Sequence, residues 1–231
     1  MRFIAFGALA LTLAVPVTSA GAHKETEKID RTITIGNNGQ LKLKNFSGDV
    51  RVTGTTGSDV VIHAIRRATR ERLDNIKLDI TSSGSSVSIE ANRRESNWRE
   101  KNDNVVETDF DIKVPFGTEL DLYSFSGRLE VTGVSGRIEA QTFSGNIELD
   151  VASSKQLQAM DVETFSGDIR ARVPGDASGR VEFSSFSGSV NSDLPISMRS
   201  SRRRNVSGDI GSGGGPTLKF HTFSGDVRIL K

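Results

Sequence analysis

Cysteine is absent from this chain of 231 residues, which excludes a disulfide scaffold and a metal site with thiolate ligands. An excess of charge of one sign is missing too. When Arg2 is set aside with the N-terminal segment, 29 of the 30 basic residues remain against 29 acidic ones. A chain without net charge has no general attraction for nucleic acid or for an anionic membrane. Its stability must therefore come from an ordinary apolar core.

The sequence also lacks an apolar run long enough to span a membrane. The run Phe3 to Val15 covers about 13 residues, which is too short to cross a bilayer as a helix. Arg2 precedes it, and Ala20-Gly21-Ala22 matches the small-residue pattern of a cleavage site. We therefore predict a secretory signal peptide at residues 1–22 and a mature chain at 23–231, with no stable membrane insertion after cleavage. An uncleaved N-terminal anchor is the alternative.

Proline and tryptophan are scarce, with five and one residues, whereas glycine is common with 23. Serine, threonine and valine are also frequent. This composition favours an all-β chain with many turns.

A six-residue motif, typified by TFSGDI at 164–169, occurs seven times. The other copies are NFSGDV, SFSGRL, TFSGNI, SFSGSV, NVSGDI and TFSGDV, at 45–50, 124–129, 142–147, 185–190, 205–210 and 222–227. Apolar residues stand five and three positions before the phenylalanine and four positions after it, with mostly polar residues between them. This alternation is typical of strands with one buried face. Ser-Gly suits a sharp corner between two such strands, because glycine reaches positive φ without steric cost.

The spacing of the copies predicts that they stack. From Phe125 onward they follow at intervals of 17 to 22 residues, and a second turn lies between them, as at Ser135-Gly136 and Ser178-Gly179. Each repeat is therefore two short strands and two turns. One such unit cannot bury its own apolar face, whereas stacked units can. We predict a parallel β-solenoid of two-strand rungs, with an antiparallel β-meander or sandwich as the alternative.

Within this solenoid we expect the phenylalanines inside, the glycines at the corners and the residue after each glycine pointing outward. Phe143, Phe165 and Phe186 are expected to be buried neighbours on successive rungs. The outward position after glycine carries Asp, Arg, Asn or Ser, so we interpret the repeat as architectural, with a calcium-binding Asp ladder as the alternative. The structural repeat residues are Phe46, Phe125, Phe143, Phe165, Phe186, Phe223, Gly48, Gly127, Gly145, Gly167, Gly188, Gly208 and Gly225.

The chain after residue 22 is predicted to be one domain with two parts. Residues 30–115 form a less regular N-terminal β part, and residues 116–231 hold the regular Ser-Gly repeats. In the N-terminal part we expect strands over 59–64, 75–81, 86–91 and 108–114, a hairpin turn at Ser83-Gly84, a helical turn near 70–73 and a charged mobile loop at 93–104.

One stretch of the chain resembles a known family. Val114-Pro115-Phe116-Gly117 leads into Leu120-Asp121-Leu122 and then into the Ser-Gly copy at 126–127, and later copies repeat Thr/Ser-Phe-Ser-Gly-Asp-Ile. In these features residues 30–231 resemble the bacterial putative adhesin domains, β-solenoid proteins related to the head-GIN adhesin-like domain. The resemblance implies a solenoid fold and an adhesin-like role. Arg203 departs from the pattern, because an apolar residue is expected three positions before Val206.

The sequence contains no recognisable catalytic constellation. The histidines, His23, His63 and His221, do not stand at metal-ligand spacing, and no nucleophile elbow, zinc-protease helix motif or phosphate loop occurs. We therefore predict that the protein is not an enzyme and has no catalytic residues, no cofactor and no metal. Carboxylate pairs across rungs, as in solenoid polysaccharide lyases and hydrolases, are the remaining route to catalysis.

Arginines form three clusters that offer a contact for a polyanion, because guanidinium groups bind phosphate and carboxylate in a bidentate manner. The alternative is a set of solvated loops balanced by Glu71, Asp74, Glu95 and Glu100. The candidate polyanion contact is Arg199, Arg202, Arg203 and Arg204, and the other clusters are Arg66, Arg67, Arg70 and Arg72, and Arg93, Arg94 and Arg99.

These observations predict an exported, non-catalytic, adhesin-like binding protein of the bacterial cell envelope. It would lie in the periplasm or at the cell surface and present its repeat surface to a glycan or a protein. One alternative is a periplasmic envelope-sensing or structural accessory protein with a protein partner. A third is a small solenoid polysaccharide lyase or hydrolase. Nucleic acid is not an expected partner.

Overall fold

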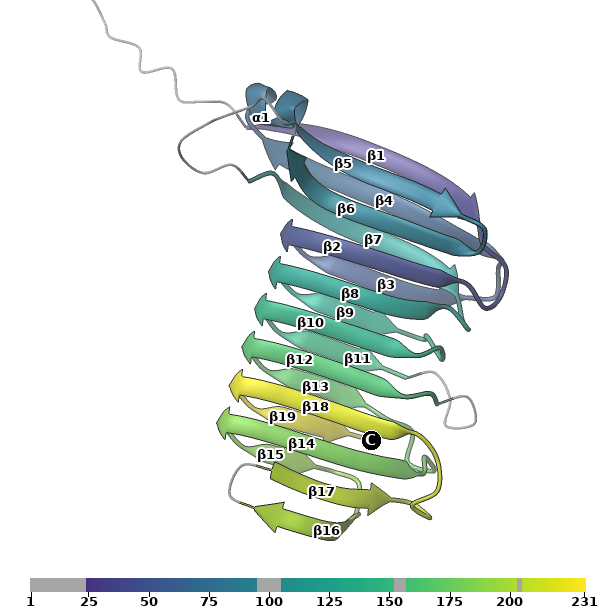
Figure 1. Cartoon of the computed structure of the whole chain (residues 1–231), viewed down its shortest axis with the longest axis vertical. Helices are drawn as coiled ribbons and strands as arrows, with labels where there is room; N and C mark the ends of the chain where they lie inside the picture. The colour runs from purple at the N-terminus through teal and green to yellow at the C-terminus, as the bar shows by residue number, and fades with distance from the viewer. Residues whose placement is uncertain (1–23, 95–104, 152–156, 203–204) are drawn as a thin grey trace, which may run out of the picture.

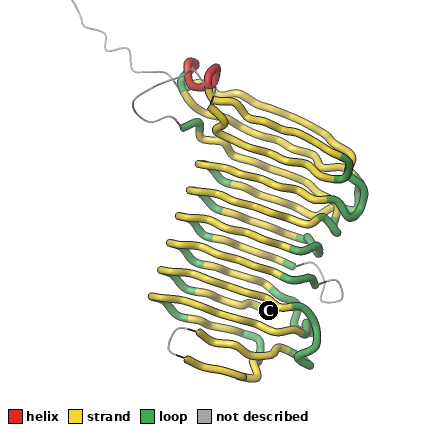
Figure 2. The backbone as a smooth tube through the Cα atoms, in the orientation of Figure 1, coloured by secondary structure: helices red, strands yellow, loops and turns green. Residues whose placement is uncertain are grey.

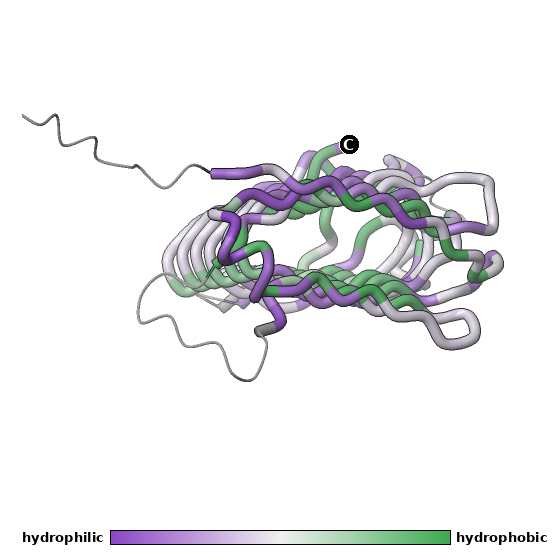
Figure 3. The backbone as a smooth tube through the Cα atoms, turned by 90° about the horizontal axis from the view of Figure 1, so that it is seen from above, coloured by the Kyte–Doolittle hydropathy of each residue, from purple (hydrophilic) through white to green (hydrophobic). Residues whose placement is uncertain are grey.

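The computed structural model describes residues 24–94, 105–151, 157–202 and 205–231. Two long β-sheets face each other and form a flattened stack (Figures 1 and 2). Viewed from above, one sheet lies on each side of a narrow interior (Figure 3). This arrangement confirms the predicted solenoid.

The described chain is mostly strand, with one short helix. The elements are β1 (Glu25–Thr34), β2 (Gln40–Ser47), β3 (Val50–Thr55), β4 (Asp59–Ala68), α1 (Arg70–Asn75), β5 (Ile76–Ser83), β6 (Ser86–Arg94), β7 (Glu107–Pro115), β8 (Glu119–Ser126), β9 (Leu129–Thr132), β10 (Ile138–Ser144), β11 (Ile147–Asp150), β12 (Met160–Ser166), β13 (Ile169–Arg172), β14 (Gly179–Ser187), β15 (Val190–Ser192), β16 (Ile196–Arg202), β17 (Asn205–Ile210), β18 (Thr217–Ser224) and β19 (Val227–Leu230).

The regular part consists of rungs, each with one strand in either sheet joined at a Ser-Gly corner. In spatial order the described rungs are β2–β3, β8–β9, β10–β11, β12–β13, β18–β19 and β14–β15. Equivalent strands pair in parallel with equivalent residues opposite one another, as Ile138 pairs with both Leu120 and Met160. Like residues therefore stack on like residues along the whole array.

The rung order differs from the sequence order. Rung β18–β19, made from the last residues of the chain, lies between β12–β13 and β14–β15 (Figure 1). The prediction that successive copies stack in sequence order is therefore wrong at this point. The inserted strand fits because its inward row matches both neighbours, with Leu218 opposite Met160 on one side and Val181 on the other.

The copy NVSGDI at 205–210 does not form a rung. It forms β17, which pairs antiparallel with β14 and β16. The prediction of a corner at Gly208 is wrong, because Gly208 is buried inside a strand, opposite Val181. Val206 lies opposite Phe183 in this antiparallel pair, so the apolar residue expected three positions before it is not required. Arg203 itself lies outside the described residues.

Antiparallel strands close both ends of the stack. At the N-terminal end, β1, β4 and β7 extend one sheet, while the hairpin β5–β6 extends the other. The predicted strands of this part, its hairpin turn and its helical turn are confirmed. Strand β1 was not predicted, because its side chains are mostly exposed and charged on both faces. Most of the predicted loop at 93–104 lies outside the described residues.

The core lies between the two sheets. Leu41, Leu43, Val50 and Val52 of the first rung are almost fully buried. Equivalent positions on the other rungs hold Leu, Ile, Val, Met, Phe and Ala, and they join in one cluster with the inner faces of the end strands. One apolar interior therefore runs through the stack.

Candidate functional site: an exposed phenylalanine ladder

The phenylalanine of each rung lies on the outer face of the ten-stranded sheet. In β2 the inward residues are Leu41, Leu43 and Asn45, so Phe46 falls on the opposite face. Side chains along a strand alternate between its two faces. Because the residues five and three positions before the phenylalanine point inward, the residue directly before the phenylalanine also points inward, and the phenylalanine points outward. The prediction that the phenylalanines are buried is therefore wrong.

The six rings form one continuous stack, named here the Phe ladder. Its members in spatial order are Phe46, Phe125, Phe143, Phe165, Phe223 and Phe186. Neighbouring ring centres are 4.7–4.9 Å apart and the ring planes are within 11° of parallel. Phe125 is half-buried, and the other five are 40–52% exposed. Phe165 and Phe186 are not neighbours, because Phe223 lies between them.

The stacking decides which part of each ring faces outward. Each inner ring has a neighbour against both of its faces, so the ladder presents ring edges along its length. A sugar that stacks on aromatic faces therefore has little to bind along the ladder. The surface is an apolar ridge about 24 Å long, the length of five steps at the spacing of paired strands.

Small polar residues fill the inward position before each phenylalanine. They are Asn45, Ser124, Thr142, Thr164, Ser185 and Thr222, all buried. The Thr164 hydroxyl donates to the carbonyl of Gly145 at 3.1 Å, and Thr222 donates to that of Gly167 at 3.3 Å. The hydroxyls of Thr142 and Ser185 have no partner among the described residues. This row supports the corner of the adjacent rung from inside.

The residues after glycine form a second polar row on the outside of the corners. Asn146 Oδ1 accepts the backbone N–H of Asp168 at 2.9 Å, and Asp168 Oδ1 accepts that of Asp226 at 3.0 Å. Asp226 Oδ1 in turn accepts the backbone N–H of Ser189 at 2.9 Å and its hydroxyl at 2.8 Å. These bonds lower the pKa of Asp226, chiefly through the Ser189 backbone N–H.

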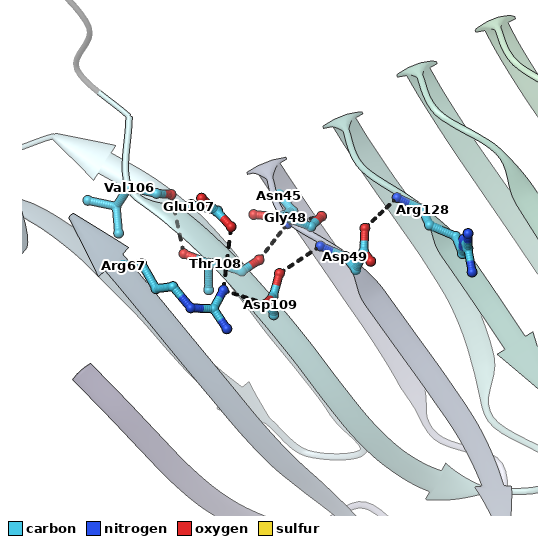
Figure 4. A network of polar contacts seen from close by, with 9 residues as sticks. All are labelled: Asn45, Gly48, Asp49, Arg67, Val106, Glu107, Thr108, Asp109 and Arg128. Carbon is cyan, nitrogen blue, oxygen red and sulfur yellow. Dashed lines mark hydrogen bonds and ion pairs between the residues drawn. The ribbon is translucent and has the colours of Figure 1, made fainter. Parts of the chain in front are cut away.

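Strand β7 continues this row by one step without the motif (Figure 4). Asp49 Oδ1 accepts the N–H of Arg128, while the N–H of Asp49 donates to Asp109 Oδ1 at 3.0 Å. Thr108, just before Asp109, stands where the corner glycine would be, and its carbonyl accepts Asn45 Nδ2 at 3.0 Å. The hydrogen bond between Asp49 and Asp109 was not predicted from the sequence. A signal for it was present, because Asp109 directly precedes the inward Phe110 just as Asp49 directly precedes the inward Val50.

The corner glycines are required by close approach between rungs. A Cβ on Gly145 would lie 2.0 Å from the carbonyl oxygen of Gly127, and one on Gly127 would lie 2.2 Å from that of Gly48. Gly127 also has φ of +126°, which side chains other than glycine rarely adopt. These contacts and this φ explain why glycine stands at these corners.

The outward carboxylates of the corner row are engaged within the protein. Their Oδ1 atoms accept backbone N–H groups, and the Oδ2 atoms of Asp168 and Asp226 pair with Arg170 and Arg228 at 3.5 and 3.6 Å. Across the part of the chain that the structure describes, no group of three or more His, Cys, Asp or Glu side chains could hold a metal ion. The calcium alternative has no support in this row.

The arginines of the first two clusters that the structure describes are paired within the protein, whereas Arg99, Glu95, Glu100 and the side chain of Arg94 lie outside the described residues. Buried Arg66 binds Glu27 and the carbonyl of Ile76, and Arg67 binds Asp109 at 2.6 Å and Glu107 at 3.4 Å. Further pairs join Arg70 to Asp74 and Glu25, and Arg93 to Asp79. The hydrogen bond to Asp109 raises the pKa of Arg67. Of the acidic residues predicted to balance these clusters, Asp74 is confirmed as a partner.

The third cluster is only partly described. Arg199 pairs with Asp209. Arg203 and Arg204 lie outside the described residues, as does the side chain of Arg202. The polyanion contact at these residues stays a prediction.

Two of the three histidines can be placed. His63 Nδ1 lies 2.5 Å from Asp30 Oδ1 on the outer face of the nine-stranded sheet. His221 is paired in register with Ser184 on one neighbouring strand and with Glu163 on the other, an order that a serine nucleophile with a histidine base would require. The Ser184 hydroxyl, however, donates its hydrogen bond to Asn205 Oδ1 at 2.8 Å. This arrangement leaves Ser184 without the histidine contact that would activate it as a nucleophile. His23 lies outside the described residues.

Comparison with known proteins assigns the family. The family model for the Toastrack DUF4097 domain matches residues 108–230, more than half of the sequence. The chain therefore belongs to the Toastrack DUF4097 family, and the predicted resemblance to bacterial putative adhesin domains is confirmed. None of the curated proteins compared with it matches.

One of the similar solved structures shows the same fold. A putative cell adhesion protein from Clostridium sporogenes is 10% identical, and the match covers 89% of this chain and 99% of that one with a TM-score of 0.64. A putative adhesin from Bacteroides fragilis, also 10% identical, matches over 88% and 97% of the two chains with a TM-score of 0.34.

Across the described residues of this chain, no helix has the length and apolar character needed to cross a membrane.

Proposed function

We propose that the protein is an adhesin-like binding protein of the bacterial cell envelope. It is exported by the signal peptide at residues 1–22, acts without catalysis and presents the rigid outer surface of residues 23–231 to a macromolecule. The observation that carries this proposal is the Phe ladder. Six apolar rings on the outside of a fold with a separate core support a contact surface, because the largest apolar patch on a soluble protein is often functional.

The geometry of the ladder favours a protein as the partner over a glycan. Sugars bind aromatic side chains through exposed ring faces, and the inner rings of the ladder have their faces covered by neighbours. Ring edges suit the aliphatic and aromatic side chains of a protein surface. This supports the hypothesis of a periplasmic accessory protein that binds a protein partner.

The partner can be sought with the mature protein, residues 23–231, immobilised and exposed to solubilised envelope extract and, separately, to a glycan array. We expect a retained protein that is lost with the double variant Phe143→Ser/Phe165→Ser and kept with Met198→Ser. Met198 is a matched control, because its side chain is 54% exposed but lies off the ladder. Equal retention by the ladder variant would refute the ladder as the contact surface, and turnover of a polysaccharide would favour the lyase or hydrolase hypothesis.

Export is tested on its own. Fractionation of the native host followed by N-terminal sequencing should place the protein in the periplasm or outside the cell and find His23 as the first residue. A protein that begins at Met1 would contradict cleavage and indicate an anchored form.

A further inference from the structure

The Phe ladder has the size of a substantial part of a protein interface. Its six rings expose about 500 Å², taking roughly 200 Å² for a whole phenylalanine side chain. A stable interface buries about 800 Å² on each partner. The ladder and the polar rows beside it on the same sheet face together reach this size.

The partner must match the chemistry and the repeat of the ladder. The two neighbouring outward rows hold five acidic side chains against three basic ones, a slight excess of negative charge that disfavours an anionic lipid surface. The acidic ones are Glu163, Asp121, Glu139, Asp161 and Glu182, and the basic ones are Lys44, Lys42 and Lys219. A second copy of the chain, in contrast, carries ring edges at the same 4.7–4.9 Å spacing. Two ladders therefore stay in register over their whole length, which a surface of another period does not achieve.

The charges beside the ladder are arranged unevenly along it. On the ten-stranded sheet, four positions before the phenylalanines, the rungs in spatial order carry Lys42, Asp121, Glu139, Asp161, Lys219 and Glu182. The basic residues are thus on the first and fifth rungs, while acidic residues occupy the second, third, fourth and last.

This order is self-complementary when one copy is reversed. Placing the first rung of one copy against the last rung of another sets Lys42 opposite Glu182 and Asp121 opposite Lys219. At the corners, the same overlay sets Arg128 opposite Asp226. Like charges meet only at the two central rungs, where Glu139 faces Asp161 and where Phe143 of one copy packs against Phe165 of the other.

We propose that the ten-stranded sheets of two copies associate face to face through their Phe ladders, antiparallel and related by a two-fold axis between the third and fourth rungs. The inference rests on the proposed role of the ladder as a contact surface, and it names one partner for it. A two-fold contact closes on itself, so the assembly stops at the dimer. The like charges at its centre make the dimer weak and reversible.

The first test is sedimentation velocity of the mature protein from about 1 µM to about 500 µM. We expect a monomer–dimer equilibrium that Phe143→Ser/Phe165→Ser weakens at least about tenfold and that Met198→Ser leaves unchanged. Circular dichroism must show that both variants are folded. A wild-type protein that stays monomeric throughout this range, or a ladder variant that dimerises as well as the wild type, would overturn the proposal.

The second test uses charge changes in place of ring truncation, and it determines the relative orientation of the two copies. Lys42→Glu and Glu182→Lys should each weaken the dimer by about twofold to fivefold, the effect of an exposed ion pair, and the double variant in one chain should restore it. Within one molecule these residues lie on the first and last rungs, too far apart to rescue each other. Failure of the double variant to restore the dimer would exclude the antiparallel arrangement and overturn the proposal.

A final arm separates this inference from the proposed function. Wild-type protein is mixed with vesicles of phosphatidylcholine alone and with the envelope extract described above. Binding to the vesicles by a monomeric protein, lost in the ladder variant, would assign the ladder to lipid and reject the dimer. Capture of an envelope protein by a monomer would reject the dimer while leaving the proposed function intact.

Discussion

At the scale of single residues, the position before each phenylalanine is the most informative in the repeat. It is small, polar and buried in every rung, and among its threonines the hydroxyl has a hydrogen-bond partner in some rungs and none in another. A buried hydroxyl without a hydrogen bond costs free energy of folding, whereas a bonded one contributes modestly. Two threonines of the same row therefore have opposite expected effects.

Thr142→Val should raise the free energy of unfolding by about 1 kcal/mol, because it removes a buried hydroxyl without a partner. Thr164→Val should lower it by about 1 kcal/mol, because the Thr164 hydroxyl donates to the carbonyl of Gly145. Urea denaturation of both variants beside the wild type measures the two effects. Equal changes in the two variants would show that the hydroxyl contacts do not decide the stability of this row.

Asp226 gives the corner row a dependence on pH. Its pKa is lowered in the folded protein, so its contribution to stability is complete above the pKa of the unfolded chain and is lost as pH falls through the folded value. Asp226→Asn should keep an acceptor for Ser189, as Asn146 does in the same row, but cannot be protonated. The variant should therefore be less stable than the wild type near pH 7 and should lose less stability on acidification.

Denaturation midpoints at about pH 7 and about pH 3 measure this difference. Asp176→Asn, on an exposed turn away from the corners, serves as the control and should follow the wild type. An Asp226→Asn variant that loses stability with acid as steeply as the wild type would contradict the role of this carboxylate.

At the scale of elements, the two aromatic rows of the ten-stranded sheet have different roles. Phe183 and Phe220 are buried between the sheets with ring centres 5.7 Å apart, whereas the Phe ladder lies outside. Burial dominates the stability contribution of an aromatic side chain, and stacking adds a smaller amount.

Phe220→Ala should lower the free energy of unfolding by about 3–5 kcal/mol, the cost of a cavity in the core. Phe165→Ala removes stacking on Phe143 and Phe223 from a ring that is 46% exposed, so it should cost only about 1–2 kcal/mol. Chemical denaturation of both variants tests the ranking. A larger loss for Phe165→Ala than for Phe220→Ala would mean that the ladder, rather than the interior, holds the rungs together.

The elements themselves could be predicted from the sequence. Alternating apolar residues marked the strands, and Ser-Gly marked the corners, because both signals are local. The face of the phenylalanine could be derived as well, since Leu41 and Leu43 fix Asn45 as the next inward residue. That prediction failed because the large apolar side chain was given more weight than the strict alternation of the strand. The exposed ladder was thereby missed as a candidate site.

At the scale of the whole molecule, the order of the rungs could not be predicted. Every rung presents the same kinds of residue to its neighbours, so Leu218 fits against Met160 and against Val181 equally well. A repeat of this kind specifies that rungs stack but carries no information on which follows which. The ion pairs of Arg66 and Arg67 escaped prediction for a related reason, because their partners Glu27 and Asp109 come from strands distant in sequence.

The place of the last rung constrains the time at which the fold can be completed. Synthesis delivers β12 to β15 before residues 217–231 exist, and the matching rows of β12 and β14 allow these strands to pair with each other at that stage. The completed protein has β18 between them, so such an early pairing must open again to admit it. A nascent chain interrupted before residue 217 can therefore form a shorter stack in which β12 pairs directly with β14. Only the final 15 residues turn that stack into the native one.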